Sequence, residues 1–150
     1  MLHVALGVTD LARSIAFYRD GLGFALVADA MAVGQAGARA LGAAGDRCDA
    51  VLLERDGFRL ELLRSASAVR AGSAGAGTLA HAALAVDDLA TTLQSLRDLG
   101  VEIVPDSLAE HARGVRSCLV RDPDGFPILL HQAPAGVASP WAERRGASAG

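Results

Sequence analysis

The chain contains the same stretch of sequence twice, and this repeat restricts its fold more than any other feature. The segment His3-Val-Ala-Leu-Gly-Val-Thr-Asp-Leu-Ala returns as His81-Ala-Ala-Leu-Ala-Val-Asp-Asp-Leu-Ala. A second block, Asp56-Gly57-Phe58-Arg59-Leu60-Glu61-Leu62, returns as Asp124-Gly125-Phe126-Pro127-Ile128-Leu129-Leu130. Two blocks that recur in the same order indicate a duplicated module, so we expect two similar units packed together.

Each copy has the pattern of a βαβββ unit. A short apolar run indicates a buried strand, and the aspartate after it, Asp10 or Asp88, suits the N-cap of a helix. The helix carries apolar residues at helical spacing, and an Asp-Gly turn later in the copy predicts a hairpin. The expected strands cover 3–8, 24–32, 49–55 and 58–64 in the first copy and 81–86, 101–104, 117–122 and 126–132 in the second.

These elements predict an α+β fold in which two tandem βαβββ modules form a cup-shaped, partly open β-barrel. We assign one domain to residues 1–133, with module one over 2–64, a small-residue linker over 65–78 and module two over 79–133. The glycine- and alanine-rich segment 34–46 is expected to form a loop over the cup. Residues 134–150 have the composition of a flexible C-terminal tail.

The composition excludes several classes of partner. The formal net charge is −3, with no basic stripe that would bind nucleic acid. No apolar run approaches the roughly 18 residues needed to cross a bilayer. Cys48 and Cys118 match no metal or redox spacing and indicate free thiols in the cytoplasm. All 14 basic residues are arginine, which is typical of a GC-rich bacterial genome.

One face of each first strand is lined by small side chains. Because side chains alternate along a strand, His3 shares its face with Ala5 and Gly7. His81 shares its face with alanines in the same way. Either histidine alone is more often a surface or hydrogen-bonded residue. The two at equivalent positions of the repeat, beside small residues, predict a ligand site.

The sequence resembles the vicinal-oxygen-chelate superfamily, which includes glyoxalase I, bleomycin-resistance proteins and extradiol dioxygenases. The resemblance rests on the segment from His3 to Phe24, which contains Phe17-Tyr18-Arg19-Asp20-Gly21-Leu22-Gly23, and on Asp122-Pro123-Asp124-Gly125-Phe126. The stretch around Glu61 and His81 is also similar to methylmalonyl-CoA epimerases. The resemblance covers nearly all of residues 2–133 and implies the cup fold and a homodimer, whose cup forms within one chain or across two.

In metal-dependent members, ligands come from the first and last strand of each module. The resemblance therefore implies His3, Glu61 and His81 as ligands of Fe, Mn, Ni or Zn, whereas the fourth position holds Leu129. A salt bridge to Arg59 is the alternative role for Glu61. Two histidines and one carboxylate leave positions open for a substrate with adjacent oxygens. Leu129 transfers no proton, so two-base epimerisation is not expected.

Two-residue Asp-Gly turns would fix the hairpin registers. Leu52 would pair with Glu61, Val120 would pair with Leu129, and Cys118 would lie beside His131. His131 shares the face of Leu129 and is either an outer base, a substrate ligand or a surface residue. The residues expected to bind substrate are Gly7, Leu52, Arg59, Cys118, Val120 and Leu129, and those expected to transfer protons are Glu61 and His131.

Two functions from different classes follow. The first is a metal-dependent dioxygenase, lyase or isomerase that acts on a small oxygenated, largely hydrophobic molecule. The second is a metal-free protein of the bleomycin-resistance type that sequesters a drug or secondary metabolite. The three retained ligands favour the enzyme, and Leu129 favours the binder. The chain has only six aromatic residues with which to stack a drug, which also favours the enzyme.

Overall fold

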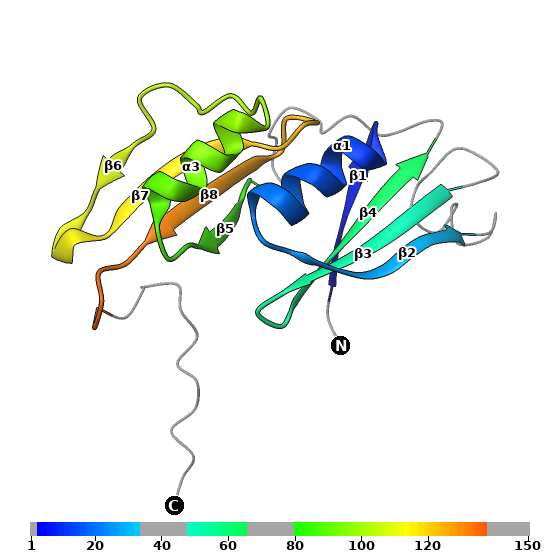
Figure 1. Ribbon diagram of the computed structural model, residues 1–150, viewed down its shortest axis with the longest axis horizontal. Coiled ribbons are helices and arrows are strands. Elements are labelled where there is room, and N and C mark those ends of the chain that lie inside the picture. The colour runs from blue at the N-terminus through cyan, green and yellow to red at the C-terminus, as the bar shows by residue number, and fades with distance from the viewer. Residues whose placement is uncertain (1–2, 34–47, 66–79, 138–150) are drawn as a thin grey trace, which may run out of the picture.

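A computed structural model describes residues 3–33, 48–65 and 80–137 and contains two four-stranded sheets, each with a helix (Figure 1). Module one comprises β1 (His3–Val8), α1 (Leu11–Ile15), a π-helix (Ala16–Gly21), β2 (Ala25–Val33), β3 (Cys48–Arg55) and β4 (Phe58–Ser65). Module two comprises β5 (Ala82–Ala85), α3 (Leu89–Asp98), β6 (Ala109–Glu110), a 3-10 turn (Ala112–Gly114), β7 (Arg116–Arg121) and β8 (Pro127–Gln132). The α+β fold is confirmed. The expected loop over 34–46 and nearly all of the linker and tail lie outside the described residues.

The two sheets repeat one topology. Their strand orders are β1-β4-β3-β2 and β5-β8-β7-β6. The first strand of each module runs parallel to the last, and the hairpin strands are antiparallel. Figure 1 shows α1 and α3 on the same side of the sheets. Alternate residues of the last strands, among them Leu62 and Leu130, are fully buried in the common core.

Both predicted helix caps are present. The carboxylate of Asp10 accepts a hydrogen bond from the amide of Arg13 at 3.1 Å, and that of Asp88 accepts one from the amide of Thr91 at 2.7 Å. Each bond satisfies an amide that the first helical turn leaves without an intrahelical partner. The strand-to-helix transitions are therefore set by local sequence in both modules.

The predicted strand over 101–104 is wrong. Ile103 makes only an isolated bridge to Val120, and the edge position of the sheet belongs to β6, the two-residue strand Ala109–Glu110. Pro105 explains the difference, because proline has no amide hydrogen to donate to a ladder and terminates the extended run. Asp106 follows with φ of 56°, which turns the chain away.

The modules pack against each other through their helices. The π-helix of module one contacts α3, and this contact depends on Gly21. A Cβ atom at Gly21 would lie 2.6 Å from Cδ2 of Leu96 and 3.2 Å from Cδ1 of Leu99. A residue without a side chain therefore allows the two helical segments to approach closely.

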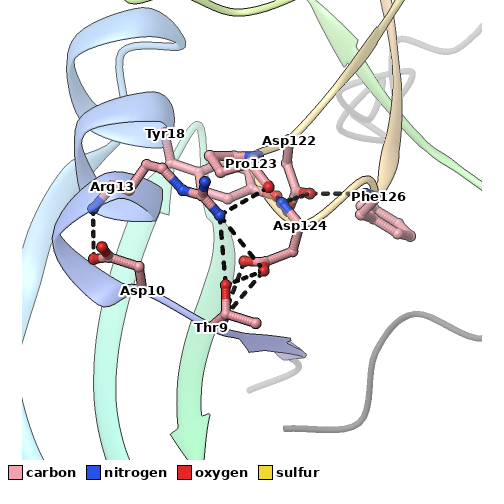
Figure 2. A network of polar contacts seen from close by, with 8 residues as sticks. All are labelled: Thr9, Asp10, Arg13, Tyr18, Asp122, Pro123, Asp124 and Phe126. Carbon is pink, nitrogen blue, oxygen red and sulfur yellow. Dashed lines mark hydrogen bonds and ion pairs between the residues drawn. The ribbon is translucent and has the colours of Figure 1, made fainter.

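A polar network ties the hairpin turn of module two to module one (Figure 2). The hydroxyl of Tyr18 donates to Asp122 at 2.9 Å, and the guanidinium of Arg13 donates to the carbonyl of Pro123 at 3.0 Å. The amide and hydroxyl of Thr9 both donate to Asp124. Six residues, three from each module, thus fix the relative orientation of the modules.

In the part of the chain that the structure describes, no helix is long and apolar enough to cross a membrane.

Candidate ligand and metal site

Two of the predicted metal ligands meet on the exposed face of module one. Nε2 of His3 lies 3.2 Å from Oε2 of Glu61. The parallel register places Glu61 beside Ala5, so no bulky side chain separates the two groups. The His3 side chain is 51% exposed and that of Glu61 is 14% exposed. The pair is therefore accessible from outside the sheet and stands close enough to share one cation.

The neighbours of this pair are as the two-residue turn predicts. Leu52 lies directly across from Glu61, which confirms the expected register of the first hairpin. Nε of Arg59 lies 2.7 Å from a carboxylate oxygen of Glu54, its register partner on β3. Gly7 is exposed on the same face. This face therefore carries small and apolar side chains together with the charged groups of Glu61, Arg59 and Glu54.

His81 does not join the pair. It lies just before β5, exposed, on the face that it shares with the exposed Ala83 and Ala85. Among the described residues, no three histidine, cysteine, aspartate or glutamate side chains stand close enough to hold a metal ion. The modules lie side by side through their helices, so each carries its own part of the predicted ligand set.

Leu129 is the structural equivalent of Glu61. Ala83 of β5 pairs with Leu129 just as Ala5 of β1 pairs with Glu61. Leu129 is half-buried, as its position on the face predicts. The fourth ligand position is consequently apolar in the folded chain as well as in the sequence.

The predicted register of the second hairpin is wrong by one residue. Leu119, and not Val120, lies across from Leu129. The cause is a three-residue loop over 123–125: a two-residue turn at Asp124-Gly125 would pair Pro123 with Phe126, but proline has no amide hydrogen to donate, and the amide of Asp122 donates to the carbonyl of Phe126 instead. As a result Cys118 and Val120 are buried in the core on the helix side and do not line the exposed face as expected.

Ser117, and not Cys118, is therefore the register partner of His131. Both residues are buried, with exposures of 4% for Ser117 and 2% for His131. Burial lowers the pKa of His131 below the ordinary histidine value. His131 thus favours the neutral form, in which an imidazole can accept a proton.

His111 is a functional candidate that the sequence did not reveal. Its Nε2 lies 2.7 Å from Oγ of Ser117. No periodic pattern marks the segment around it, because β6 has only two residues. The contact depends on the hairpin between β6 and β7, whose register pairs Ala109 with Ser117.

A cavity of about 640 Å³ lies elsewhere, on the helix side between the modules. Its lining includes Arg13, Phe17, Leu99, Glu102, Pro105 and Arg121. None of the predicted ligands lines it. The exposed sheet faces, which carry the candidate metal ligands, remain the better site for the expected chemistry.

One family model matches most of the chain. The family model of the Glyoxalase/Bleomycin resistance protein/Dioxygenase superfamily matches residues 1–130. No curated protein sequence matches the chain.

Solved structures share the fold at low sequence identity. A glyoxalase family protein from Bacillus cereus has a TM-score of 0.74 at 23% identity, covering 88% of this chain and 92% of its own. The trypanothione-dependent glyoxalase I of Leishmania major has a TM-score of 0.62 at 26% identity, with coverages of 88% and 85%. The fosfomycin resistance protein FosX of Mesorhizobium loti has a TM-score of 0.60 at 15% identity, with coverages of 90% and 92%.

Proposed function

Because the chain belongs to the glyoxalase/bleomycin resistance protein/dioxygenase superfamily, we propose that it is a metal-dependent enzyme acting on a small oxygenated, largely apolar substrate. The observation that carries the proposal is the contact between His3 and Glu61 on an exposed sheet face. The imidazole of His3 and the carboxylate of Glu61, together with a second imidazole that the repeat supplies at His81, form a donor set suited to Fe, Mn, Ni or Zn.

The third ligand comes from a second copy of the chain. His81 is exposed, and within one chain it stands apart from His3 and Glu61. In a homodimer with two-fold symmetry, module one of one protomer faces module two of its partner, and the reciprocal contact forms a second identical site. The exposed faces of both modules are then covered together, and the cup closes around the ligand.

The ligand set leaves positions open for substrate oxygens. A bound cation would act as a Lewis acid on adjacent oxygens or would support reaction with O₂. Glu61 serves either as a firm ligand or as a base, and His131 is the second candidate for proton transfer. Leu52 and Leu129 supply apolar contacts to the body of the substrate, while Gly7 leaves room for it. Arg59 supplies a cation at the rim of the same face.

One observation favours a metal-free ligand-binding protein instead. Leu129 occupies the position of the fourth ligand, and its side chain makes that part of the cup apolar. A protein that only sequesters a hydrophobic drug or secondary metabolite needs no metal and gains from an apolar wall. The two functions differ in one measurable property, the metal content of the purified protein.

The test is metal analysis by mass spectrometry on protein purified without a histidine tag. The enzyme requires about one metal ion per chain, lost in His81→Ala, because a site with one of three ligands missing binds far more weakly. Glu110→Ala, which removes an exposed carboxylate at the far edge of module two, is the matched control. Protein that takes up no Fe, Mn, Ni or Zn on reconstitution would refute the enzyme and leave the binder.

A further inference from the structure

The cavity on the helix side, between the modules, has an apolar part and a cationic part. Phe17 of the π-helix and Leu99 and Val101, which follow α3, supply apolar surface, and the guanidinium groups of Arg13 and Arg121 also line the cavity. Its volume of about 640 Å³ suits a small organic molecule. The polar junction between the second hairpin turn and α1 fixes the two modules around it (Figure 2).

The repeat shows that the fold does not require this cavity. Leu22 and Leu99 occupy equivalent positions after the helix of each module, yet Leu22 is 2% exposed and Leu99 is 43% exposed. In module one the guanidinium of Arg55, next to the first hairpin turn, donates to the carbonyl of Leu22, and its side chain is mostly buried. In module two the guanidinium of Arg121 instead donates to the carbonyl of Gly125, within its own turn, at 3.0 Å. Leu99 is therefore left without a comparable cover, at the wall of the cavity.

Both cations of the cavity are attached to the second hairpin turn. Arg13 donates to the carbonyl of Pro123 at 3.0 Å and lies 3.8 Å from a carboxylate oxygen of Asp124, so its charge is partly balanced. Arg121 is exposed, and it forms no ion pair within the part of the chain that the structure describes. A guanidinium has several N–H donors in a planar fork, and the bond to Gly125 uses one of them. Arg121 can therefore still bind both oxygens of a carboxylate.

Two acidic residues also line the cavity and limit the charge of a ligand. Asp122 is buried, and its carboxylate already accepts hydrogen bonds from the hydroxyl of Tyr18 and from two backbone amides. Glu102 is exposed, and no described residue forms an ion pair with it. Its carboxylate repels a second negative charge on a ligand whose first charge is attracted by Arg121. The lining therefore favours a monoanion over a dianion.

We propose that this cavity is a ligand site separate from the sheet faces, and that it binds a small apolar molecule carrying a single carboxylate. The carboxylate pairs with Arg121 beside the turn, and the apolar body covers Leu99, Phe17 and Val101. None of the predicted metal ligands lines the cavity, so the inference goes beyond the proposed function and does not depend on it.

Naphthoate is a suitable probe, because it joins a flat apolar ring system to one carboxylate. Its binding to the untagged full chain is measured by isothermal titration calorimetry, and we expect about one molecule per chain. Naphthalenemethanol has the same rings without the charge and should bind about tenfold more weakly, since a hydrogen bond to a charged group is lost. Naphthyl phosphate, a dianion at about pH 8, should also bind more weakly than naphthoate.

Arg121→Gln tests the ion pair, and Arg116→Gln, which changes an exposed arginine at the other end of β7, is the matched control. We expect Arg121→Gln to lower the affinity for naphthoate about tenfold or more and Arg116→Gln to leave it unchanged. Arg121→Gln should retain its affinity for naphthalenemethanol, which verifies that the cavity is still formed. Glu102→Gln should raise the affinity for naphthyl phosphate, a gain that a misfolded chain would not give.

Three results would overturn the inference. The first is that the native chain binds no naphthoate, and the second is that Arg121→Gln binds it as tightly as the native chain. The third is that binding is lost in Arg59→Gln and kept in Arg121→Gln, which would place naphthoate on the exposed face of module one. Metal content is measured in the same samples and tests the proposed function separately, because a metal-free chain that binds naphthoate through Arg121 would refute only the metal site.

Discussion

Leu129 takes the place on β8 that Glu61 takes on β4, since each lies beside the small residue that follows its module's first histidine by two positions. A single substitution should therefore supply the fourth ligand. We expect Leu129→Glu to raise the affinity for zinc by about tenfold or more, measured by competition with a chelating dye. Leu129→Gln has the same size without the charge and should leave affinity unchanged. Equal affinities in the two variants would show that position 129 does not face the metal.

Tyr18→Phe tests the junction between the modules and has a predicted pH dependence. Asp122 loses the hydrogen bond from Tyr18, which costs about 1–3 kcal/mol at a buried site. Burial raises the pKa of Asp122, and the bonds from Phe126, Tyr18 and Asp124 oppose that rise.

The sign of this dependence follows from the raised pKa. A carboxyl whose pKa is higher in the folded state favours the protonated form, so its contribution to stability falls as pH rises above the unfolded value of about 3.9. Without the hydrogen bond from Tyr18, the pKa of Asp122 rises further, so the free energy of unfolding falls more as the pH increases. Urea unfolding at several pH values should show the loss in Tyr18→Phe growing from acid to neutral pH. A loss that does not vary with pH would contradict this assignment.

Gly21→Ala tests the close approach of the two helical segments. A methyl group there would lie within 2.6 Å of Leu96, which is fully buried and has little freedom to move. Overpacking of this kind costs about 1–3 kcal/mol. Ala12→Ser, on the exposed face of α1, is a control of similar size. Thermal unfolding that is unchanged in Gly21→Ala would mean that the modules do not pack as described.

His131→Leu copies the equivalent residue of module one. Burial lowers the pKa of His131, so the unfolded chain binds this proton more readily than the folded chain does. The stability from the neutral form is full above the unfolded value of about 6.5 and is lost as pH falls through it. We expect the variant to lose less stability than the native chain between neutral and mildly acid pH. Parallel stability curves would contradict the assignment.

Much of the fold was predictable from the sequence because local signals agreed with the repeat. Asp10 and Asp88 cap their helices, and Asp56-Gly57 closes its hairpin with the expected register. The second hairpin was mispredicted because the same Asp-Gly pair follows Pro123, and a one-residue difference in loop length exchanges the two faces of β7.

The candidate site was predictable only in part. The resemblance to the superfamily implied that His3 and Glu61 belong to one site, and the two side chains meet because both lie on long regular strands that pair in parallel. His111 was missed, since its contact with Ser117 arises across a two-residue strand without a pattern. The separation of His81 from His3 depends on how the modules pack, and no local sequence feature encodes that arrangement.

The central claim is that His3 and Glu61 of one protomer share a metal with His81 of another. Glu61→Ala and His81→Ala are each expected to lack bound metal. When the two variants are mixed, unfolded and refolded together, a heterodimer contains one intact site and one site that lacks both residues.

Metal analysis of the mixture is therefore the most direct measurement. A 1:1 mixture forms about half heterodimers, so we predict about a quarter of the native metal content per chain. Native mass spectrometry of variants with different masses verifies that heterodimers form. Heterodimers without metal would contradict a site shared between protomers.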